Sequence, residues 1–96
     1  TFTNAERRLG RVRKVMEPRN GMADWEITVA LAQALGLPMN YGHPSEIMDE
    51  IARLTPSFAG ISYEKLDELG SVQWPCNQNA PTGTPVMHRE GFVRGK

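Results

Sequence analysis

The sequence contains one cysteine, so no disulfide bond can form within the chain. It has no apolar run close to the roughly 18 residues of a transmembrane helix and no signal-peptide pattern. Neither sign of charge is in excess, because eleven basic residues balance eleven acidic ones. We therefore exclude a disulfide-stabilised scaffold, a membrane span and a protein drawn as a whole to nucleic acid. A reducing compartment suits the single thiol, and we expect a cytoplasmic protein.

Short motifs that carry chemistry are also missing. The sequence has no CxxC pair, no GxGxxG motif, no phosphate-binding loop and no internal repeat. His43 and His88 are far apart, and Cys76 lacks an identifiable base, whereas metal sites and nucleophilic thiols need partners at suitable spacing. We therefore expect no metal site and no catalytic residue. The carboxylates between Glu46 and Glu68 follow helix-surface spacing and indicate solvated faces.

Three segments have the pattern of helices. The clearest begins at Asp24, a residue type that commonly caps helices, and ends at Gly36, with Pro38 preventing its continuation. Its apolar side chains recur at the spacing of one apolar stripe along the helix: Ile27, Ala30, Leu31, Ala34 and Leu35.

The other two helices follow in the middle of the chain. The second begins near His43, with Pro44 as its first helical residue, and ends at Pro56. We expect four apolar residues to form its buried face: Ile47, Met48, Ile51 and Leu54. The third helix is short, with Ser62 as its cap and Gly70 at its end.

The two ends of the sequence differ from this helical middle part. Near the N-terminus, Thr3 and Glu6 have the spacing of a capping box, and apolar residues follow at helical intervals, which favours a helix. The same stretch is basic, with six arginine and lysine residues up to Arg19. The other end is rich in proline and glycine, which predicts a connector with at most a short strand around residues 85–88.

These patterns together predict a mainly α fold. We expect a small bundle of about three helices in residues 23–70, preceded by a basic segment in residues 1–22 and followed by an irregular connector in residues 71–96. A chain of 96 residues buries a modest fraction of its surface, and the sequence reads as the middle of a longer protein.

Several stretches are familiar: TFTNAERR, the pair Asp24-Trp25, HPSEIMDEIARLTPSFAG, SYEKLDELGSVQWPCN and GTPVMHREGFVRGK. Together they resemble an internal segment of the catalytic (alpha) subunit of molybdopterin-dependent formate dehydrogenases, within the molybdopterin oxidoreductase family. The resemblance covers nearly the whole chain. It implies that the helical bundle belongs to a larger α/β cofactor-binding domain, and that the N-terminal segment is partly extended, so helix and strand both stand as interpretations of that segment.

The resemblance also implies a function for the parent protein. That enzyme would be an oxidoreductase that converts formate to carbon dioxide, using molybdenum or tungsten held by two molybdopterin guanine dinucleotides. Electrons would pass to iron–sulfur clusters and to other formate dehydrogenase subunits. The metal ligand and the catalytic residues would lie outside this segment, so we expect the isolated segment to be inactive and to bind no cofactor.

One residue of this segment is assigned a role by the resemblance. It implies that Asp24 contacts the guanine of one molybdopterin guanine dinucleotide. A carboxylate suits this contact, because guanine presents a ring N–H and an amino group side by side. The residues alone favour a different role for Asp24, that of helix cap. Both interpretations stand at this point.

An alternative function of a different class is a stand-alone helical protein-interaction module without catalysis. Nucleic-acid binding by the basic segment is disfavoured, because aromatic residues are not interleaved with its cations. In the formate dehydrogenase interpretation the partners are the rest of the catalytic subunit and the other subunits. We expect the isolated segment to self-associate or to pack loosely, because its apolar helix faces would lack their partners.

Overall fold

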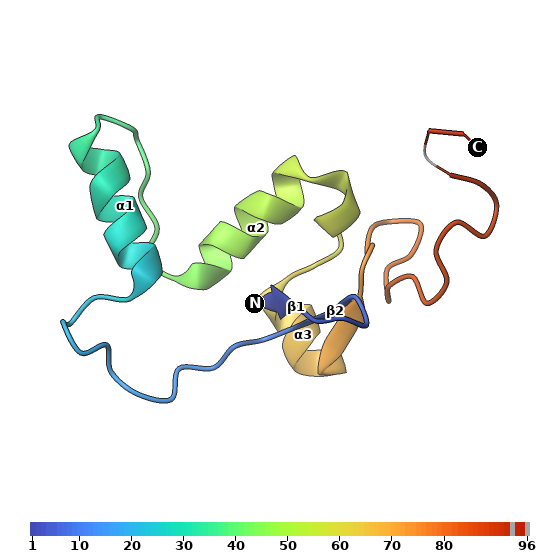
Figure 1. Cartoon of the computed structure of the whole chain (residues 1–96), viewed down its shortest axis with the longest axis horizontal. Helices are drawn as coiled ribbons and strands as arrows, with labels where there is room; N and C mark the ends of the chain where they lie inside the picture. The colour runs from blue at the N-terminus through green and yellow to red at the C-terminus, as the bar shows by residue number, and fades with distance from the viewer. Residues whose placement is uncertain (93, 96) are drawn as a thin grey trace.

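The computed structural model describes residues 1–92 and 94–95, and the remaining positions of the predicted connector, 93 and 96, lie outside the described residues. Within them the chain forms a three-stranded antiparallel sheet and three α-helices (Figure 1). The elements in chain order are β1 (Phe2–Thr3), β2 (Arg8–Gly10), α1 (Asp24–Ala34), α2 (Pro44–Leu54), the 3₁₀ turn η1 (Pro56–Phe58), α3 (Tyr63–Leu69) and β3 (Ser71–Gln73). The prediction of a mainly α fold is therefore wrong, because the fold is a small mixed α/β unit.

The sheet is built from the segment for which the sequence favoured a helix. β1 and β2 form a hairpin, and β2 also pairs with β3, with Leu9 opposite Val72. The turn between β1 and β2 depends on Asn4, whose side-chain oxygen accepts hydrogen bonds from the backbone N–H groups of Glu6 and Arg8, both at 2.9 Å. An asparagine that binds nearby backbone groups competes with helix formation. The helical interpretation is thus wrong, and the extended one is correct.

The hydrophobic core lies where this sheet meets α2 and α3. Its buried members come from both ends and the middle of the sequence: Leu9, Met48, Ile61, Leu66, Val72 and Cys76. Cys76 is fully buried, and Gly60 lies so close to it that a Cβ at position 60 would be 2.7 Å from the sulfur. The thiol is therefore part of the packing of the core.

The C-terminal connector is fastened to the hairpin by Arg7, which lies in the turn with a φ of 61°. Its guanidinium group donates hydrogen bonds to the backbone carbonyls of Trp74, Thr84 and Pro85. The connector also begins later than predicted, because its first three residues form β3. The short strand expected around residues 85–88 is absent from the described residues, which form bends there.

The helix boundaries agree with the sequence better than the helix environments do. α2 begins at Pro44 after the cap His43, as predicted, and the Ser62 hydroxyl of α3 accepts a hydrogen bond from the Lys65 N–H at 3.1 Å. The buried face of α2 is only partly as expected, since Met48 is buried but Leu54 is exposed.

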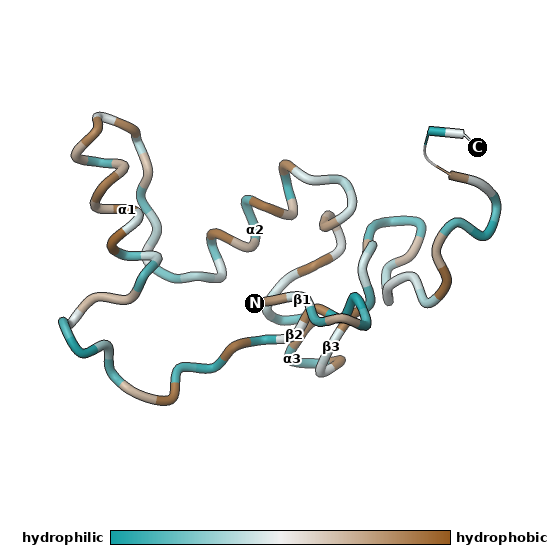
Figure 2. Tube along the Cα trace, in the orientation of Figure 1, coloured by the Kyte–Doolittle hydropathy of each residue, from teal (hydrophilic) through white to brown (hydrophobic). Residues whose placement is uncertain are grey.

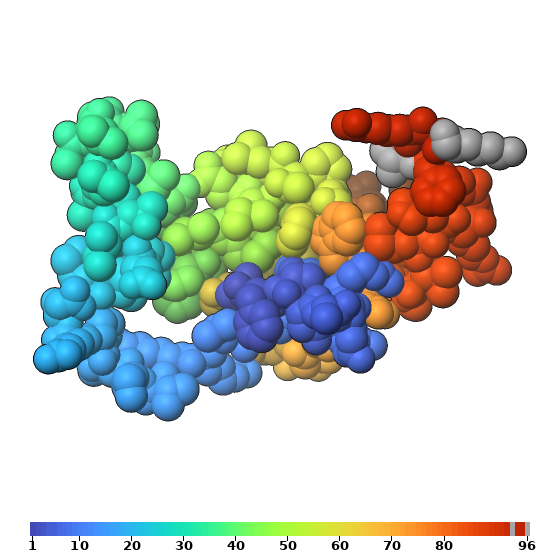
Figure 3. Space-filling model, viewed as in Figure 1, coloured from blue at the N-terminus to red at the C-terminus, as the bar shows by residue number. Residues whose placement is uncertain are grey.

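The predicted apolar stripe of α1 is exposed. Its largest side chains, Ile27, Leu31 and Leu35, are 43%, 61% and 71% exposed. The reason is visible in Figures 1 and 3: α1 stands at one end of the molecule, away from the sheet and α3. None of the helices among the described residues has the length and apolar composition that crossing a membrane requires.

Candidate functional site

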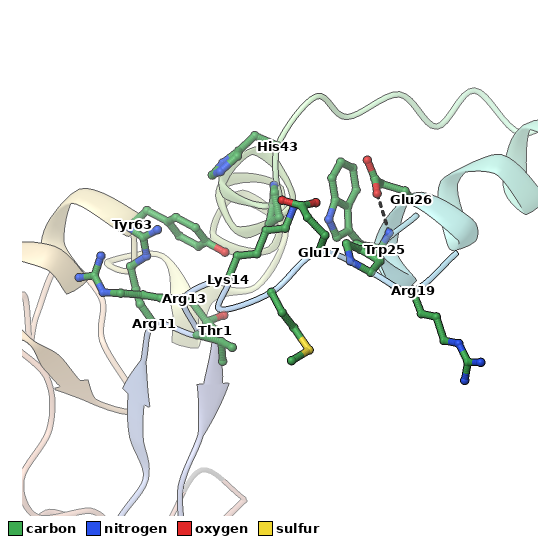
Figure 4. A pocket seen from close by; sticks show the side chains of 15 residues that line it. Thr1, Arg11, Arg13, Lys14, Glu17, Arg19, Trp25, Glu26, His43 and Tyr63 are labelled. Carbon is green, nitrogen blue, oxygen red and sulfur yellow. Dashed lines mark hydrogen bonds and ion pairs between the residues drawn. The ribbon is translucent and has the colours of Figure 1, made fainter. Parts of the chain in front are cut away.

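A cavity of about 780 Å³ lies between the basic segment and the first turns of α1 and α2 (Figure 4). Residues 11–19 form one wall and arch away from α2, leaving an opening in the space-filling view (Figure 3). Four cations and three aromatic or imidazole rings take part in the lining: Arg11, Arg13, Lys14, Arg19, Trp25, His43 and Tyr63. Such a volume and such rings are typical of a small-molecule pocket.

The cations of this cavity are largely used within the chain. Arg11 and Arg13 both form ion pairs with Asp67 of α3, and the guanidinium of Arg11 lies over the Tyr63 ring, 4.2 Å from its centroid. Lys14 pairs with Glu17 at 2.6 Å. The contacts of Arg11 and Arg13 hold the extended basic segment against α3. Three of the four cations therefore have partners within the chain.

The predicted site residue, Asp24, lies at the edge of this cavity. It is the first residue of α1, between Ala23 and Trp25, which line the cavity, although Asp24 itself does not. Its side chain is exposed and makes no hydrogen bond or ion pair among the described residues. At the N-terminus of a helix, the aligned peptide dipoles favour a negative charge. The arrangement presents an exposed side chain that has no partner among the described residues.

The interpretation of Asp24 as a helix cap is wrong. The cap position is occupied by Ala23, which has no side-chain acceptor, and the Ala23 N–H donates a hydrogen bond to the Glu26 carboxylate at 2.6 Å. Glu26 thus supplies half of a capping box, and Asp24 follows the cap by one residue. The guanine contact is a separate matter and stays a prediction.

The other residues considered for chemistry are held by structural contacts. His43 caps α2, its Nδ1 lying 3.2 Å from the Ser45 N–H, and its ring meets Tyr63 edge-on. His88 packs on Phe92, with 4.6 Å between the ring centroids. Cys76 is enclosed in the core. Among the described residues no group of three or more histidine, cysteine, aspartate and glutamate side chains is arranged to hold a metal ion.

A second, shallower hollow of about 420 Å³ lies beside α2 and is mainly acidic. Its carboxylates have local partners: Glu50 accepts a hydrogen bond from the Tyr41 hydroxyl, and Glu46 accepts one from the Gly42 N–H at 2.8 Å. The hydrogen bond to Glu50 raises the pKa of Tyr41 above its usual value, with burial adding to the effect. These contacts tie the loop before α2 to the helix, so the hollow is a structural feature.

Sequence reasoning could not find the cavity itself. The sequence shows the basic segment, but the rings that complete the lining come from α1, from the cap of α2 and from α3. The tertiary ion pairs of Arg11 and Arg13 with Asp67 of α3 help to bring these parts together.

No family model matches this sequence. Among curated proteins, the chain is 50% identical over 93 residues to proteins named "Putative formate dehydrogenase" in Staphylococcus aureus strains USA300, NCTC 8325 and COL. The matched region covers 96% of this chain and 9% of each relative. The chain therefore spans about a tenth of the length of these relatives. Their names agree with the resemblance seen in the sequence at the level of formate dehydrogenase.

Proposed function

We propose that this chain is an internal segment of the catalytic subunit of a molybdopterin-dependent formate dehydrogenase. The observation that carries the proposal is the 50% identity over 93 residues to proteins bearing the formate dehydrogenase name. The match to 9% of each relative explains why the chain holds no recognisable catalytic set of its own. In this proposal the parent enzyme oxidises formate, and this segment braces the domain that holds the cofactor.

The proposal gives Asp24 the role of a guanine contact. The fit rests on its surroundings: the carboxylate is exposed, it stands in the first turn of a helix and it makes no hydrogen bond within the described residues. Its two oxygens are free to accept hydrogen bonds from the ring N–H and the amino group of guanine. The dinucleotide would supply the pterin ligands of the metal, whereas Asp24 would bind and orient its nucleotide end.

The guanine contact is tested by Asp24→Asn in the full-length enzyme. The substitution replaces one acceptor oxygen with a donor that would face the donors of guanine. A hydrogen bond to a charged group contributes about 1.5–3 kcal/mol, so affinity for the dinucleotide should fall on the order of tenfold or more. The measurement is molybdenum and guanine nucleotide per subunit, in cells with limiting cofactor supply.

Glu26→Gln is the matched control, because it removes a negative charge from the same helical turn. The Gln side chain still accepts a hydrogen bond from the Ala23 N–H, so cofactor content should stay within twofold of the wild type. Full cofactor content in Asp24→Asn would contradict the proposed contact between Asp24 and guanine. The wider proposal has its own test: a purified, cofactor-loaded parent enzyme that fails to reduce an electron acceptor with formate would contradict it.

A further inference from the structure

Helix α1 lacks the charged face that a surface helix of a globular protein normally carries. Its only charged side chains, Asp24 and Glu26, stand in the first turn. From residue 27 to residue 38 the sequence, ITVALAQALGLP, has no charged residue. By contrast α2, which is also 11 residues long, carries four charged residues: Glu46, Asp49, Glu50 and Arg53. The composition of α1 is that of a helix made for an interior position.

One side of α1 is covered by the chain itself. The loop after the helix turns back along it, with hydrogen bonds from the Leu37 N–H to the Ala32 carbonyl at 3.0 Å and from the Gln33 side chain to the Met39 carbonyl at 2.7 Å. On this side Val29 and Ala32 are buried. The loop therefore takes the place that the protein core would occupy for an ordinary amphipathic helix.

The opposite side of α1 is apolar and bare. Ile27, Leu31 and Leu35 follow one another at intervals of four residues, so they form a stripe along the helix. Ala30 and Ala34, which are also exposed, lie beside the stripe. The hydropathy view shows apolar residues along much of α1, with hydrophilic stretches between them (Figure 2). A helix that is apolar on both sides is stable in water only when both sides are covered.

We propose that the bare side of α1 is covered by another segment of the same polypeptide, outside these 96 residues, which makes α1 an interior helix of the larger protein. The relatives extend far beyond the matched region, which is 9% of their length, so they contain the chain needed to cover it. This inference rests on the proposed function only in placing the chain within a longer polypeptide, and it does not depend on formate chemistry.

A second copy of this chain is a poorer fit for the bare side. An 11-residue helix is about 16 Å long and about 10 Å wide, so one of its sides offers on the order of 160 Å² of footprint. A stable association of two proteins buries about 800 Å² on each partner. A covalently connected segment needs no such area, because it loses little translational and rotational freedom when it packs. The small area therefore favours packing within one polypeptide.

The test is Leu31→Asp, made both in the 96-residue chain and in the longer polypeptide. In the 96-residue chain residue 31 is already in water, so the thermal midpoint should shift by less than about 2 °C, whereas in the longer polypeptide burial of the carboxylate should lower the midpoint of the domain that contains α1 by more than about 5 °C. Gln78→Asp adds the same charge at an exposed turn and should have little effect in either. Equal, small effects of Leu31→Asp in both would overturn the proposal.

Hydrogen exchange on the two wild-type proteins provides a second measurement, which does not depend on a variant that folds. The amides of α1 should exchange at least about 100-fold more slowly in the longer polypeptide than in the 96-residue chain. Equal rates would overturn the proposal. If the amides of α1 exchange slowly in a longer polypeptide that does not oxidise formate, this inference is supported and the proposed function is rejected.

Discussion

Replacing Gly83 with alanine should lower the free energy of unfolding of this chain more than the same replacement at Gly70. Both glycines have positive φ angles, 99° and 74°, which L-residues rarely adopt. They differ in what a new Cβ would meet. At position 83 it would lie 2.5 Å from the Gln73 carbonyl oxygen and 2.9 Å from the Gln73 nitrogen, whereas at position 70 no atom lies within 4 Å.

The loss of stability in each variant is the sum of two contributions, the strained backbone conformation and the steric clash of the new Cβ. The unfavourable backbone conformation costs about 1–2 kcal/mol and applies to both variants. The steric clash adds about 1–3 kcal/mol at position 83 only. The backbone at residue 83 cannot easily move away to relieve this clash, because Gly83 pairs with Gln73 in a β-bridge and the Thr84 N–H donates a hydrogen bond to the Gln73 carbonyl at 3.0 Å. The difference between the variants should thus be about 1–3 kcal/mol, or roughly 4–24 °C in thermal midpoint for a chain of this size.

Thermal and urea unfolding, followed by far-ultraviolet circular dichroism, measure this difference directly. Gly70→Ala is the control for the backbone term, and it should leave a cooperative transition. Equal midpoints for Gly83→Ala and Gly70→Ala would show that the connector does not pack against β3 as described, and the reasoning would fail. A midpoint difference with an unchanged urea slope would support it, because the denatured state is then the same for both.

Two further predictions concern single side chains. The Tyr41 phenol, whose pKa is raised by its hydrogen bond to Glu50, should titrate above 10.0 when followed by ultraviolet absorbance, and its pKa should return toward that value in Glu50→Gln. The hydrogen bond stabilises the fold at pH values below the pKa of the unfolded phenol. This stabilisation is lost as the pH rises through the pKa of the folded state. Ser62→Ala should lower the free energy of unfolding by about 1 kcal/mol, because Ser62 caps α3. Asp24→Ala should lower it by less than that, because Ala23 holds the cap position of α1. Equal losses of the two variants in urea unfolding would contradict the assignment of the two caps.

Helix positions were predictable from this sequence because their signals are local. Pro44 and Ser62 fix the first turns of α2 and α3 through the geometry of neighbouring residues, and the structure keeps those starts. The N-terminal hairpin was not predictable in this way. Its stability depends on the pairing of Leu9 with Val72, a residue at the far end of the chain, and on the Asn4 side chain. A long-range pairing therefore outweighed a capping-box pattern.

The sequence located the apolar stripe of α1 but not what covers it, and it misplaced the cap of this helix by one residue. An apolar helix face indicates that some partner exists, but it does not say whether that partner lies in the same 96 residues. The cap assignment failed because Asp24 and Ala23 differ by one position, and Glu26 satisfies the Ala23 N–H from within the helix. Periodicity locates a helix face well, whereas it leaves helix ends uncertain by a residue or two.

Apolar side chains are packed in one part of the chain, around the sheet, and left exposed in another, at α1. Around the sheet, apolar side chains are buried, α3 is capped and Arg7 fastens the connector, so this part supports itself. At α1 the apolar side and the Asp24 carboxylate are both left exposed. Since the two features lie on one short helix, the packing that we propose over Leu31 would also fix the direction in which Asp24 points. A ligand contact at Asp24 would therefore depend on that packing, and Leu31→Asp should impair cofactor retention in the full-length enzyme even though Leu31 does not line the cavity.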